Sequence, residues 1–313
     1  MKYAIGVDLG GTNIAVGLVD CETRRIVCKD SIKTRAPRSS AEIAADIAAL
    51  CRSVCKKHGI ALADASHVGV GAPGCVKNGC VLDASNLGWH NEPLGACIEQ
   101  ALSLPCFVAN DANAAALAEA VWGVGCGASS LVLLTLGTGV GGGIVLDGKI
   151  WEGFNGCASE PGHVIVEAEG RACTCGNRGC LEAYCSATAI IRESRRAMER
   201  CPESIMWRLS GGLDGVTGKT AFDAAKRGDF AARAIVDSFI RYLAIGIINI
   251  VNILQPEIIA IGGGLSAQGE ALLLPLQKQV EALNPGSVKC ARIALATFGN
   301  DAGILGAALL DGR

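Results

Sequence analysis

Two apolar runs, each interrupted by a glycine-rich turn, constrain the fold more than any other feature of the sequence. The first run covers residues 3–20 with its turn at 9–13, and the second covers residues 131–147 with its turn at 137–143. Apolar residues on both sides of a short glycine turn are typical of a β-hairpin. The sequence therefore predicts two strand–turn–strand units, about 130 residues apart.

The two hairpins form a weak internal repeat. When Asp8 is aligned with Thr135, Gly10 falls on Gly137, and the aspartates that end the return strands also coincide. Repeats of this kind indicate two related α/β domains, each opening with a hairpin whose turn faces a shared, hinged cleft. We expect a smaller domain over 1–109 plus 299–313 and a larger one over 110–298.

Other segments complete the predicted α/β pattern. A third glycine turn at 262–264 begins at the last residue of the apolar strand 258–262. It precedes a helical stretch over 268–283. Apolar periodicity predicts the remaining elements: strands at 25–33 and 68–71, and helices at 41–58, 112–121, 222–226, 229–254 and 301–310.

Composition excludes several classes of partner. The 313 residues carry a formal net charge of −2, half of them are apolar, and no Lys/Arg cluster occurs. We therefore expect no nucleic-acid or membrane surface and a small-molecule partner. The most apolar stretch, 242–254, is shorter than a membrane span and is interpreted as a buried helix. The N-terminus shows no secretory core, so the sixteen cysteines are expected to be reduced in a cytoplasmic protein.

The glycine turns are candidates for binding phosphate. Glycine lets backbone N–H groups approach an anion because no Cβ intervenes. The residues expected to line a nucleotide triphosphate are Gly10, Gly11, Thr12, Asn13, Thr138, Gly139, Gly262, Gly263 and Gly264. Asp8, directly before the first turn, is the carboxylate expected to orient hydrated Mg²⁺. Taken singly, each turn could be an ordinary hairpin turn.

A short cysteine cluster predicts a metal site. Cys173, Cys175 and Cys180 lie within eight residues, and His163 lies ten residues before the first of them. Three thiolates and one imidazole make the closed tetrahedral set of structural zinc. The alternative is a group of buried thiols beside a surface histidine.

Asp111 is the candidate acid/base residue. It follows the short strand Phe107–Asn110 and precedes the alanine-rich helix, so it lies where a strand ends and a helix begins. The positive end of the helix dipole stabilises a carboxylate there in the form that accepts a proton. The alternative is that Asp111 is only the N-cap of the helix.

Five motifs, in order, resemble the ROK family of bacterial sugar kinases and repressors, with the nearest likeness to its glucokinases. They are Asp8–Asn13, Ala109–Ala114, Leu136–Gly143, Glu160–His163 and Cys173–Glu182. The resemblance spans nearly the whole chain, and the His–Cys cluster is its most specific part. It implies ribonuclease-H-like (actin/hexokinase-like) domains with mixed sheets, and a homodimer or higher homo-oligomer.

The resemblance also implies an activity, which is phosphoryl transfer from MgATP to a sugar hydroxyl, with glucose favoured. It makes Asp111 the general base that takes the proton from the sugar 6-hydroxyl. The residues implied to bind the sugar are Asn86, Asn110, Asp111, Glu160, His163 and Glu182. His163 would serve both zinc and sugar, so zinc would hold the sugar-binding residues in place.

One position departs from the family pattern, and several alternatives stay open. Pro161 stands where an aliphatic residue is usual, and its missing N–H could tilt Glu160. Mannose, fructose or N-acetylmannosamine could replace glucose, and polyphosphate or ADP could replace ATP. A sugar-responsive repressor would need a DNA-binding domain before the first strand, which here begins at Tyr3. A non-catalytic sugar sensor is disfavoured because Asp8 and Asp111 are both present.

Overall fold

The computed structural model describes residues 2–284 and 291–311 and divides into two compact units. The first unit comprises Met1–Leu131, Gly143–Ser159 and Thr297–Arg313, and the second comprises Val132–Gly142 and Glu160–Ala296. The boundaries 1–109 with 299–313 and 110–298 stay a prediction. The compact units differ from them mainly because residues 110–131 and 143–159 group with the N-terminal part.

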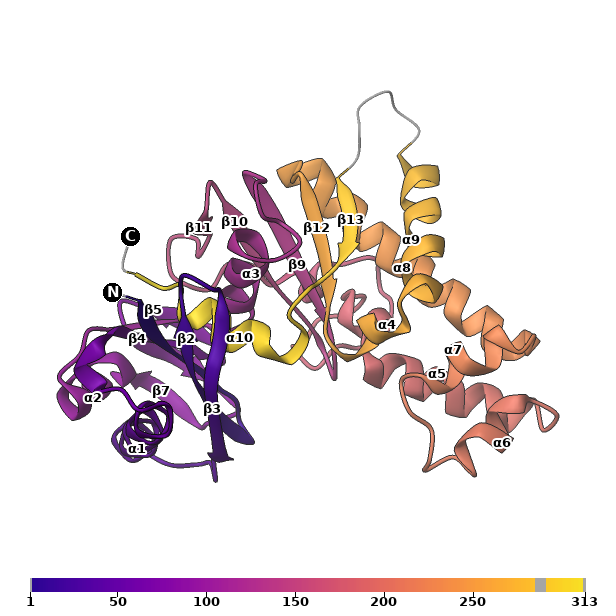
Figure 1. Cartoon of the computed structure of the whole chain (residues 1–313). Helices are drawn as coiled ribbons and strands as arrows, with labels where there is room; N and C mark the ends of the chain where they lie inside the picture. Colours follow the sequence, from indigo (N-terminus) through magenta and orange to yellow (C-terminus); the bar gives the residue numbers. More distant parts are fainter. Residues whose placement is uncertain (1, 285–290, 312–313) are drawn as a thin grey trace. The chain divides into compact units, whose positions relative to one another are not determined.

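The first unit is built on a five-stranded sheet in the order β3-β2-β1-β4-β8 (Figure 1). Its strands are β1 (Tyr3–Leu9), β2 (Asn13–Asp20), β3 (Arg25–Lys33), β4 (Ala65–Ala72) and β8 (Cys106–Asn110). The first three form an antiparallel meander, and β4 and β8 run parallel to β1. The carboxyl ends of β1, β4 and β8 therefore meet at one edge of the sheet.

Helices cover both faces of this sheet. α1 (Ser40–His58) and α2 (Leu94–Leu102) share a core with Ile5 and Val7 of β1. On the other face, α3 (Asp111–Val121) and α10 (Ala302–Ala307) contact each other and β4. α10 comes so close that a Cβ on Gly6 would lie 1.9 Å from the Ile304 carbonyl oxygen. Glycine is required there for close packing, since any side chain would push the helix away.

A small antiparallel sheet in the same unit carries a disulfide. Its strands are β5 (Cys75–Lys77), β6 (Cys80–Ala84) and β7 (Trp89–Glu92). Cys75 is bonded to Cys157, with their Cα atoms 4.9 Å apart. The prediction that all cysteines are reduced is therefore wrong for this pair, because packing brings together two thiols 82 residues apart. Thirteen other cysteines are free, and Cys290 lies outside the described residues.

A second five-stranded sheet has the order β11-β10-β9-β12-β13. Its strands are β9 (Ser130–Leu136), β10 (Val140–Leu146), β11 (Lys149–Ile150), β12 (Ile258–Gly262) and β13 (Arg292–Leu295). The helices of the second unit are α4 (Glu182–Cys185), α5 (Ala187–Arg200), α6 (Ile205–Ser210), α7 (Thr220–Lys226), α8 (Phe230–Leu254) and α9 (Glu270–Leu283). The predicted second hairpin is confirmed as β9 and β10, and the predicted helices agree within a few residues, although α10 is shorter than the predicted 301–310.

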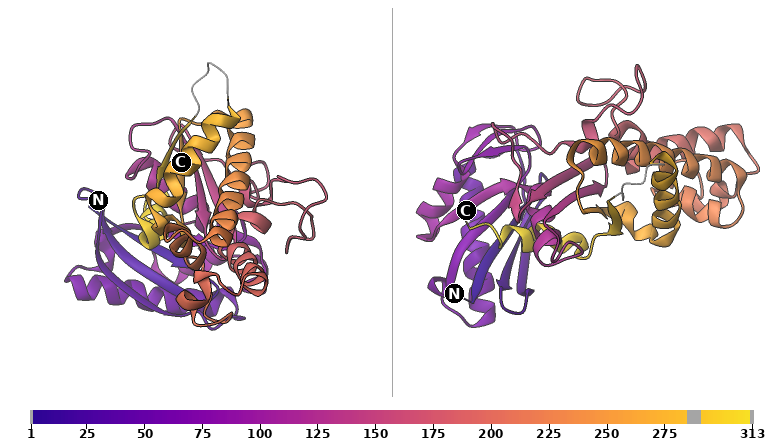
Figure 2. Two further views of the ribbon diagram at one scale, coloured as in Figure 1. Left: turned by 90° about the vertical axis from the view of Figure 1, so that its right-hand side faces the viewer. Right: turned by 90° about the horizontal axis from the view of Figure 1, so that it is seen from above.

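α8 is long and apolar enough to cross a membrane by length and composition. In the structure it packs against α4, α5, α7 and α9, and its contact with α9 is visible in Figure 2. Leu243, Ala244 and Ile247 have no exposed surface. These contacts agree with the interpretation of 242–254 as the core segment of a helix.

Candidate active site

The first glycine turn is held in a fixed conformation by hydrogen bonds. Gly10 N–H donates to the Asn13 carbonyl at 2.9 Å. Thr34, directly after β3, donates from its hydroxyl to the Gly10 carbonyl at 2.6 Å and from its backbone to Thr12 at 2.9 Å. Thr34 is completely buried. It supports the turn across 24 residues of sequence, and no sequence pattern marked it.

Asp8 lies at the carboxyl end of β1, beside this turn. Burial raises the pKa of its carboxyl, and the charge of Lys29 opposes that shift. A Cβ on Gly303 would lie 3.0 Å from Asp8 Cγ and 3.2 Å from one carboxylate oxygen. Gly303 of α10 thus leaves the space beside the carboxylate open, a role that the sequence analysis did not find.

Asn110 and Asp111 lie at the carboxyl end of β8. The Asn110 amide oxygen accepts bonds from Ala112 N–H at 2.9 Å and Asn113 N–H at 3.1 Å, and its Nδ2 donates to the Gly74 carbonyl at 3.0 Å. Asn110 is therefore the N-cap of α3, and the alternative assignment of that role to Asp111 is wrong. Asp111 is the first helical residue, and its Oδ1 accepts the Ala112 N–H at 2.8 Å.

Strand register relates the two aspartates. Asp8 of β1 pairs with Gly71 of β4, and Gly71 pairs with Ala109 of β8. Asp111 follows Ala109 by two residues, so the two carboxylates belong to the same sheet edge, two strands apart. Two interstrand spacings correspond to about 10 Å. Such a distance suits a metal-bound phosphate on one side and a proton acceptor on the other.

Asn86 contacts the first glycine turn. It lies on the exposed connection between β6 and β7, and a Cβ on Gly11 would lie 3.2 Å from Asn86 Cβ. The structure thus brings this predicted sugar-binding residue next to a predicted phosphate-binding residue, although 75 positions separate them.

The second glycine turn is anchored to α5. Gly137 N–H bonds to the Gly139 carbonyl at 3.0 Å, and the Gly137 carbonyl accepts Ala187 N–H at 2.7 Å. The Thr188 hydroxyl donates to the Thr138 carbonyl at 2.8 Å. The start of α5 therefore sets the conformation of the turn.

The third glycine turn packs against β9. Gly263 has φ +78°, and a Cβ there would lie 2.5 Å from Leu136 N. Ser266 Oγ donates to the Gly263 carbonyl at 2.8 Å. A side chain at 263 would be excluded both by conformation and by contact, so glycine is required.

The four predicted zinc ligands come together. Their donor atoms, from His163, Cys173, Cys175 and Cys180, all lie within 4.8 Å of one another. The loop folds this tightly because Gly176 and Gly179 have φ +91° and +80°, and a Cβ on Gly179 would collide with the Glu167 carbonyl. Three sulfurs and one imidazole nitrogen at this spacing fit a tetrahedral zinc ion.

Glu182 connects the cysteine loop with the second glycine turn. Its Oε2 accepts Val140 N–H at 2.9 Å, and its Oε1 accepts the Thr174 hydroxyl at 3.2 Å. A Cβ on Gly139 would lie 2.2 Å from Oε2. The carboxylate therefore bridges the loop that holds the metal ligands and the turn that is a candidate for phosphate.

Pro161 occupies a position that suits proline. It is the first residue of a 3-10 turn, Pro161–His163, in which the His163 N–H donates to the Glu160 carbonyl at 3.1 Å. The N–H that proline lacks is not needed here, because the first N–H of such a turn has no partner within the turn. Partial burial raises the pKa of the Glu160 carboxyl, Glu182 acts in the same direction, and His163 opposes both.

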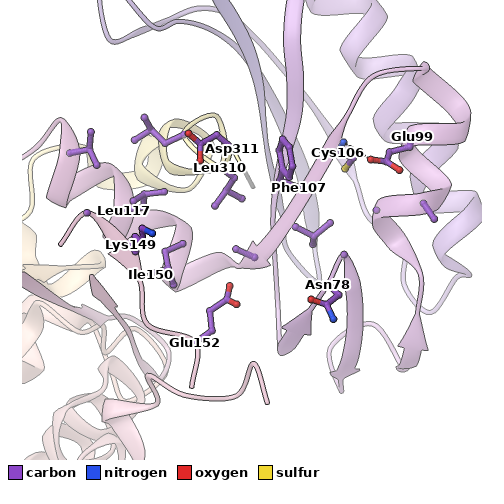
Figure 3. Close-up of a pocket in the computed structure, with 18 of the residues that line it drawn as sticks. Asn78, Glu99, Cys106, Phe107, Leu117, Lys149, Ile150, Glu152, Leu310 and Asp311 are labelled. Carbon is purple, nitrogen blue, oxygen red and sulfur yellow. Dashed lines mark hydrogen bonds between the residues drawn. The ribbon is translucent and has the colours of Figure 1, made fainter. Parts of the chain in front are cut away.

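A cavity of about 830 Å³ lies elsewhere in the first unit. Figure 3 shows Glu99, Phe107, Glu152 and Asp311 among its lining residues. None of the predicted site residues lines it. It lies along β8 and the β10–β11 turn, and Ala109, the residue before Asn110, is part of its lining.

The ROK family model matches residues 4–312. The chain is 41% identical to a glucokinase of Halalkalibacterium halodurans, over 97% of this chain and 93% of that protein, and 40% identical to a glucokinase of Thermotoga maritima, over 97% and 95%. A ROK family glucokinase from Streptomyces griseus, solved in complex with glucose and AMPPNP, superimposes with a TM-score of 0.81 and 36% identity over 98% of both chains.

These relatives cover the chain from end to end, so the likeness does not depend on one motif. The structural likeness confirms the predicted fold class, a mixed-sheet α/β protein of the actin/hexokinase-like kind. The chain belongs to the ROK family.

Proposed function

We propose that this chain phosphorylates glucose at its 6-hydroxyl with ATP as the donor. The observation that carries the proposal is end-to-end similarity to glucokinases at about 40% identity, together with Asp8 and Asp111 at one sheet edge. Identity at this level favours the glucokinase activity over that of more distant ROK kinases.

Asp111 acts as the general base. Its place in the first turn of α3 favours the ionised carboxylate, because the helix dipole is positive there. Proton removal at the attacking hydroxyl makes the oxygen a better nucleophile as it approaches the γ-phosphorus. Asn110 fixes the start of the helix and so the direction of the Asp111 side chain.

The glycine turns bind the nucleotide. Backbone N–H groups of the turns at 10–13 and 137–139 hold phosphate oxygens, and Gly262–Gly264 lies near the nucleoside. Asp8 would orient hydrated Mg²⁺, which would supply charge neutralisation on the phosphates. The bonds from Thr34 and Thr188 keep the turns ordered before ATP binds, which lowers the entropic cost of binding.

Polar side chains from both units bind the sugar. Asn86, Asn110, Glu160, His163 and Glu182 hydrogen-bond the hydroxyl groups. A structural Zn²⁺ on His163, Cys173, Cys175 and Cys180 fits the donor set and keeps the loop rigid. Polar groups that pair with the hydroxyls reject a sugar that lacks the matching hydroxyl, because they would be left without a partner in the complex.

We also propose that the protein is a cytoplasmic homodimer, as the family resemblance implies. The cytoplasmic location is supported by α8, the one apolar helix of membrane-spanning length among the described residues, because it packs against other helices of the second unit as a core helix does. Light scattering after gel filtration tests the dimer, and a mass of one chain would contradict it.

The test is the formation of sugar phosphate from glucose, mannose, fructose or N-acetylmannosamine, with MgATP, polyphosphate or ADP as the donor. We expect fast turnover that is selective for glucose and ATP. Faster turnover with another of these sugars would identify that sugar as the substrate. No turnover with any combination of sugar and donor would favour a non-catalytic sugar sensor.

A further inference from the structure

The Cys75–Cys157 disulfide lies beside two segments that carry proposed sugar-binding residues. Cys75 follows Gly74, whose carbonyl accepts the Asn110 side chain at 3.0 Å. Cys157 precedes Glu160 by three residues, and the chain leaves the first unit between Ser159 and Glu160. The bond therefore joins the segment that supports Asn110 to the segment that leads into Glu160.

The segment 151–159 is docked on β5 by further contacts. The Lys77 ammonium donates to the Phe154 carbonyl at 2.6 Å. Gly156 lies so close to Val76 that a Cβ would be 2.1 Å from its carbonyl oxygen. These contacts hold the two cysteines near each other in either redox state, so the bond can form and break without a large rearrangement.

The two cysteines are accessible to a small reagent. Both are only partly buried, whereas Cys51 and Cys185 are buried in the cores of their units. The Cα atoms of Cys75 and Cys157 are 4.9 Å apart, which lies within the range of Cα separations that a disulfide spans. Exposure also allows the exchange partner to reach the sulfur.

We propose that Cys75 and Cys157 form a reversible redox site that takes a low-molecular-weight disulfide such as glutathione disulfide. One cysteine thiolate attacks the reagent and releases one thiol, forming a mixed disulfide. The second thiolate then displaces the other thiol and leaves the Cys75–Cys157 bond. Two protein thiols are oxidised and one small disulfide is reduced to two thiols.

The expected consequence is a change in sugar affinity, and this part rests on the proposed function. Residues 158–159 connect the bond to Glu160 and are tied back to their own loop, by Ala158 N–H to the Glu152 carbonyl at 3.1 Å and by the Ser159 hydroxyl to the Trp151 carbonyl at 2.8 Å. The bond in turn links this loop covalently to β5. When it is reduced, the loop keeps its hydrogen bonds but loses its covalent link to β5, so sugar binding must restrict more of its motion and the KM for glucose rises. Ordering part of one or two residues corresponds to about a threefold to tenfold change, and kcat stays nearly constant because Asp111 is not affected.

The experiment uses the full-length protein equilibrated over a range of reduced to oxidised glutathione ratios. Acid quenching, alkylation and peptide mapping measure the fraction of Cys75 linked to Cys157, without any need for activity. Zinc content is measured in each sample, because the cysteine loop must stay intact. We expect the linked fraction to rise and fall reversibly, with a lower KM for glucose in the linked form.

Variants separate the bond from general oxidation. Cys75→Ser and Cys157→Ser should each keep the reduced-state KM at every ratio. Cys126→Ser, which removes an exposed free cysteine of the same unit, should leave the redox response unchanged. If the protein lacks kinase activity, the rate of hydrogen exchange over residues 151–159 measures the restraint that the disulfide places on this segment.

Three results would overturn the proposal. One is the absence of a linked peptide at the most oxidising ratio, and another is a bond that persists at the most reducing ratio. The third is an equal KM, or equal hydrogen exchange when no activity exists, in the linked and reduced forms.

Discussion

Glu119 of α3 is completely buried. Its carboxylate binds the segment at Thr297, where the chain re-enters the first unit. Its Oε1 accepts the N–H groups of Thr297 and Phe298, both at 2.8 Å, and its Oε2 accepts Val124 N–H at 3.2 Å. Three backbone donors therefore depend on one side chain. Because these donors lie on segments about 180 residues apart in sequence, the carboxylate fixes a long-range contact.

Replacing Glu119 with Gln tests this arrangement. The amide has one acceptor oxygen, so we expect it to keep the hydrogen bonds from Thr297 and Phe298 N–H. Its NH₂ group would then face Val124 N–H, and two donors cannot form a hydrogen bond. Hydrogen bonds to a charged group contribute about 1.5–3 kcal/mol each, and a buried donor without a partner costs about 1–3 kcal/mol. The free energy of unfolding should therefore fall by about 2–4 kcal/mol, and by more in Glu119→Ala, which leaves all three donors without this partner.

Urea denaturation followed by circular dichroism measures the change. Glu99→Gln is the matched control, since Glu99 is exposed and accepts one backbone bond, from Cys106 N–H at 3.0 Å. The control should stay within about 0.5 kcal/mol of the parent. A Glu119→Gln protein as stable as this control would refute the reasoning.

Four further predictions concern the proposed site. Asp111→Asn should bind glucose with near-normal affinity in calorimetry yet lose turnover by about 10²–10⁴-fold; near-parental turnover would contradict the general-base role. Cys175→Ser should release zinc, measured by metal analysis, and raise the KM for glucose, and a parent protein without zinc would refute the metal site. Gly303→Ala should raise the Mg²⁺ concentration for half-maximal rate by roughly tenfold, because the Cβ displaces Asp8 by tenths of an ångström; Gly303→Ser should be worse, and unchanged Mg²⁺ dependence would contradict the assignment. Burial raises the pKa of Asp8, so this carboxylate becomes protonated at a higher pH than an ordinary aspartate does. Activation by Mg²⁺ should therefore weaken as the pH falls through that range, and a Mg²⁺ activation that does not change with pH would refute this.

Local patterns in the sequence determined the main elements and part of the site. The hairpins, six of the helices and the cysteine loop depend on residues close in sequence, so spacing and residue type were sufficient to predict them. The helices α2, α4, α5 and α6 were not predicted. The cysteine cluster is the clearest case, since three of its four ligands lie within eight residues. The resemblance to the ROK family supplied the assignment of sugar-binding residues, which local patterns alone did not contain.

Tertiary structure decided the contacts that join distant segments. Thr34 under the first turn, Gly303 beside Asp8 and the Cys75–Cys157 bond have no local signature, because each depends on which surfaces pack together. The same reason explains why the reduced-cysteine prediction was wrong for one pair. Side-chain type limits what a residue can do, but its partner is set by the packing of segments far apart in sequence.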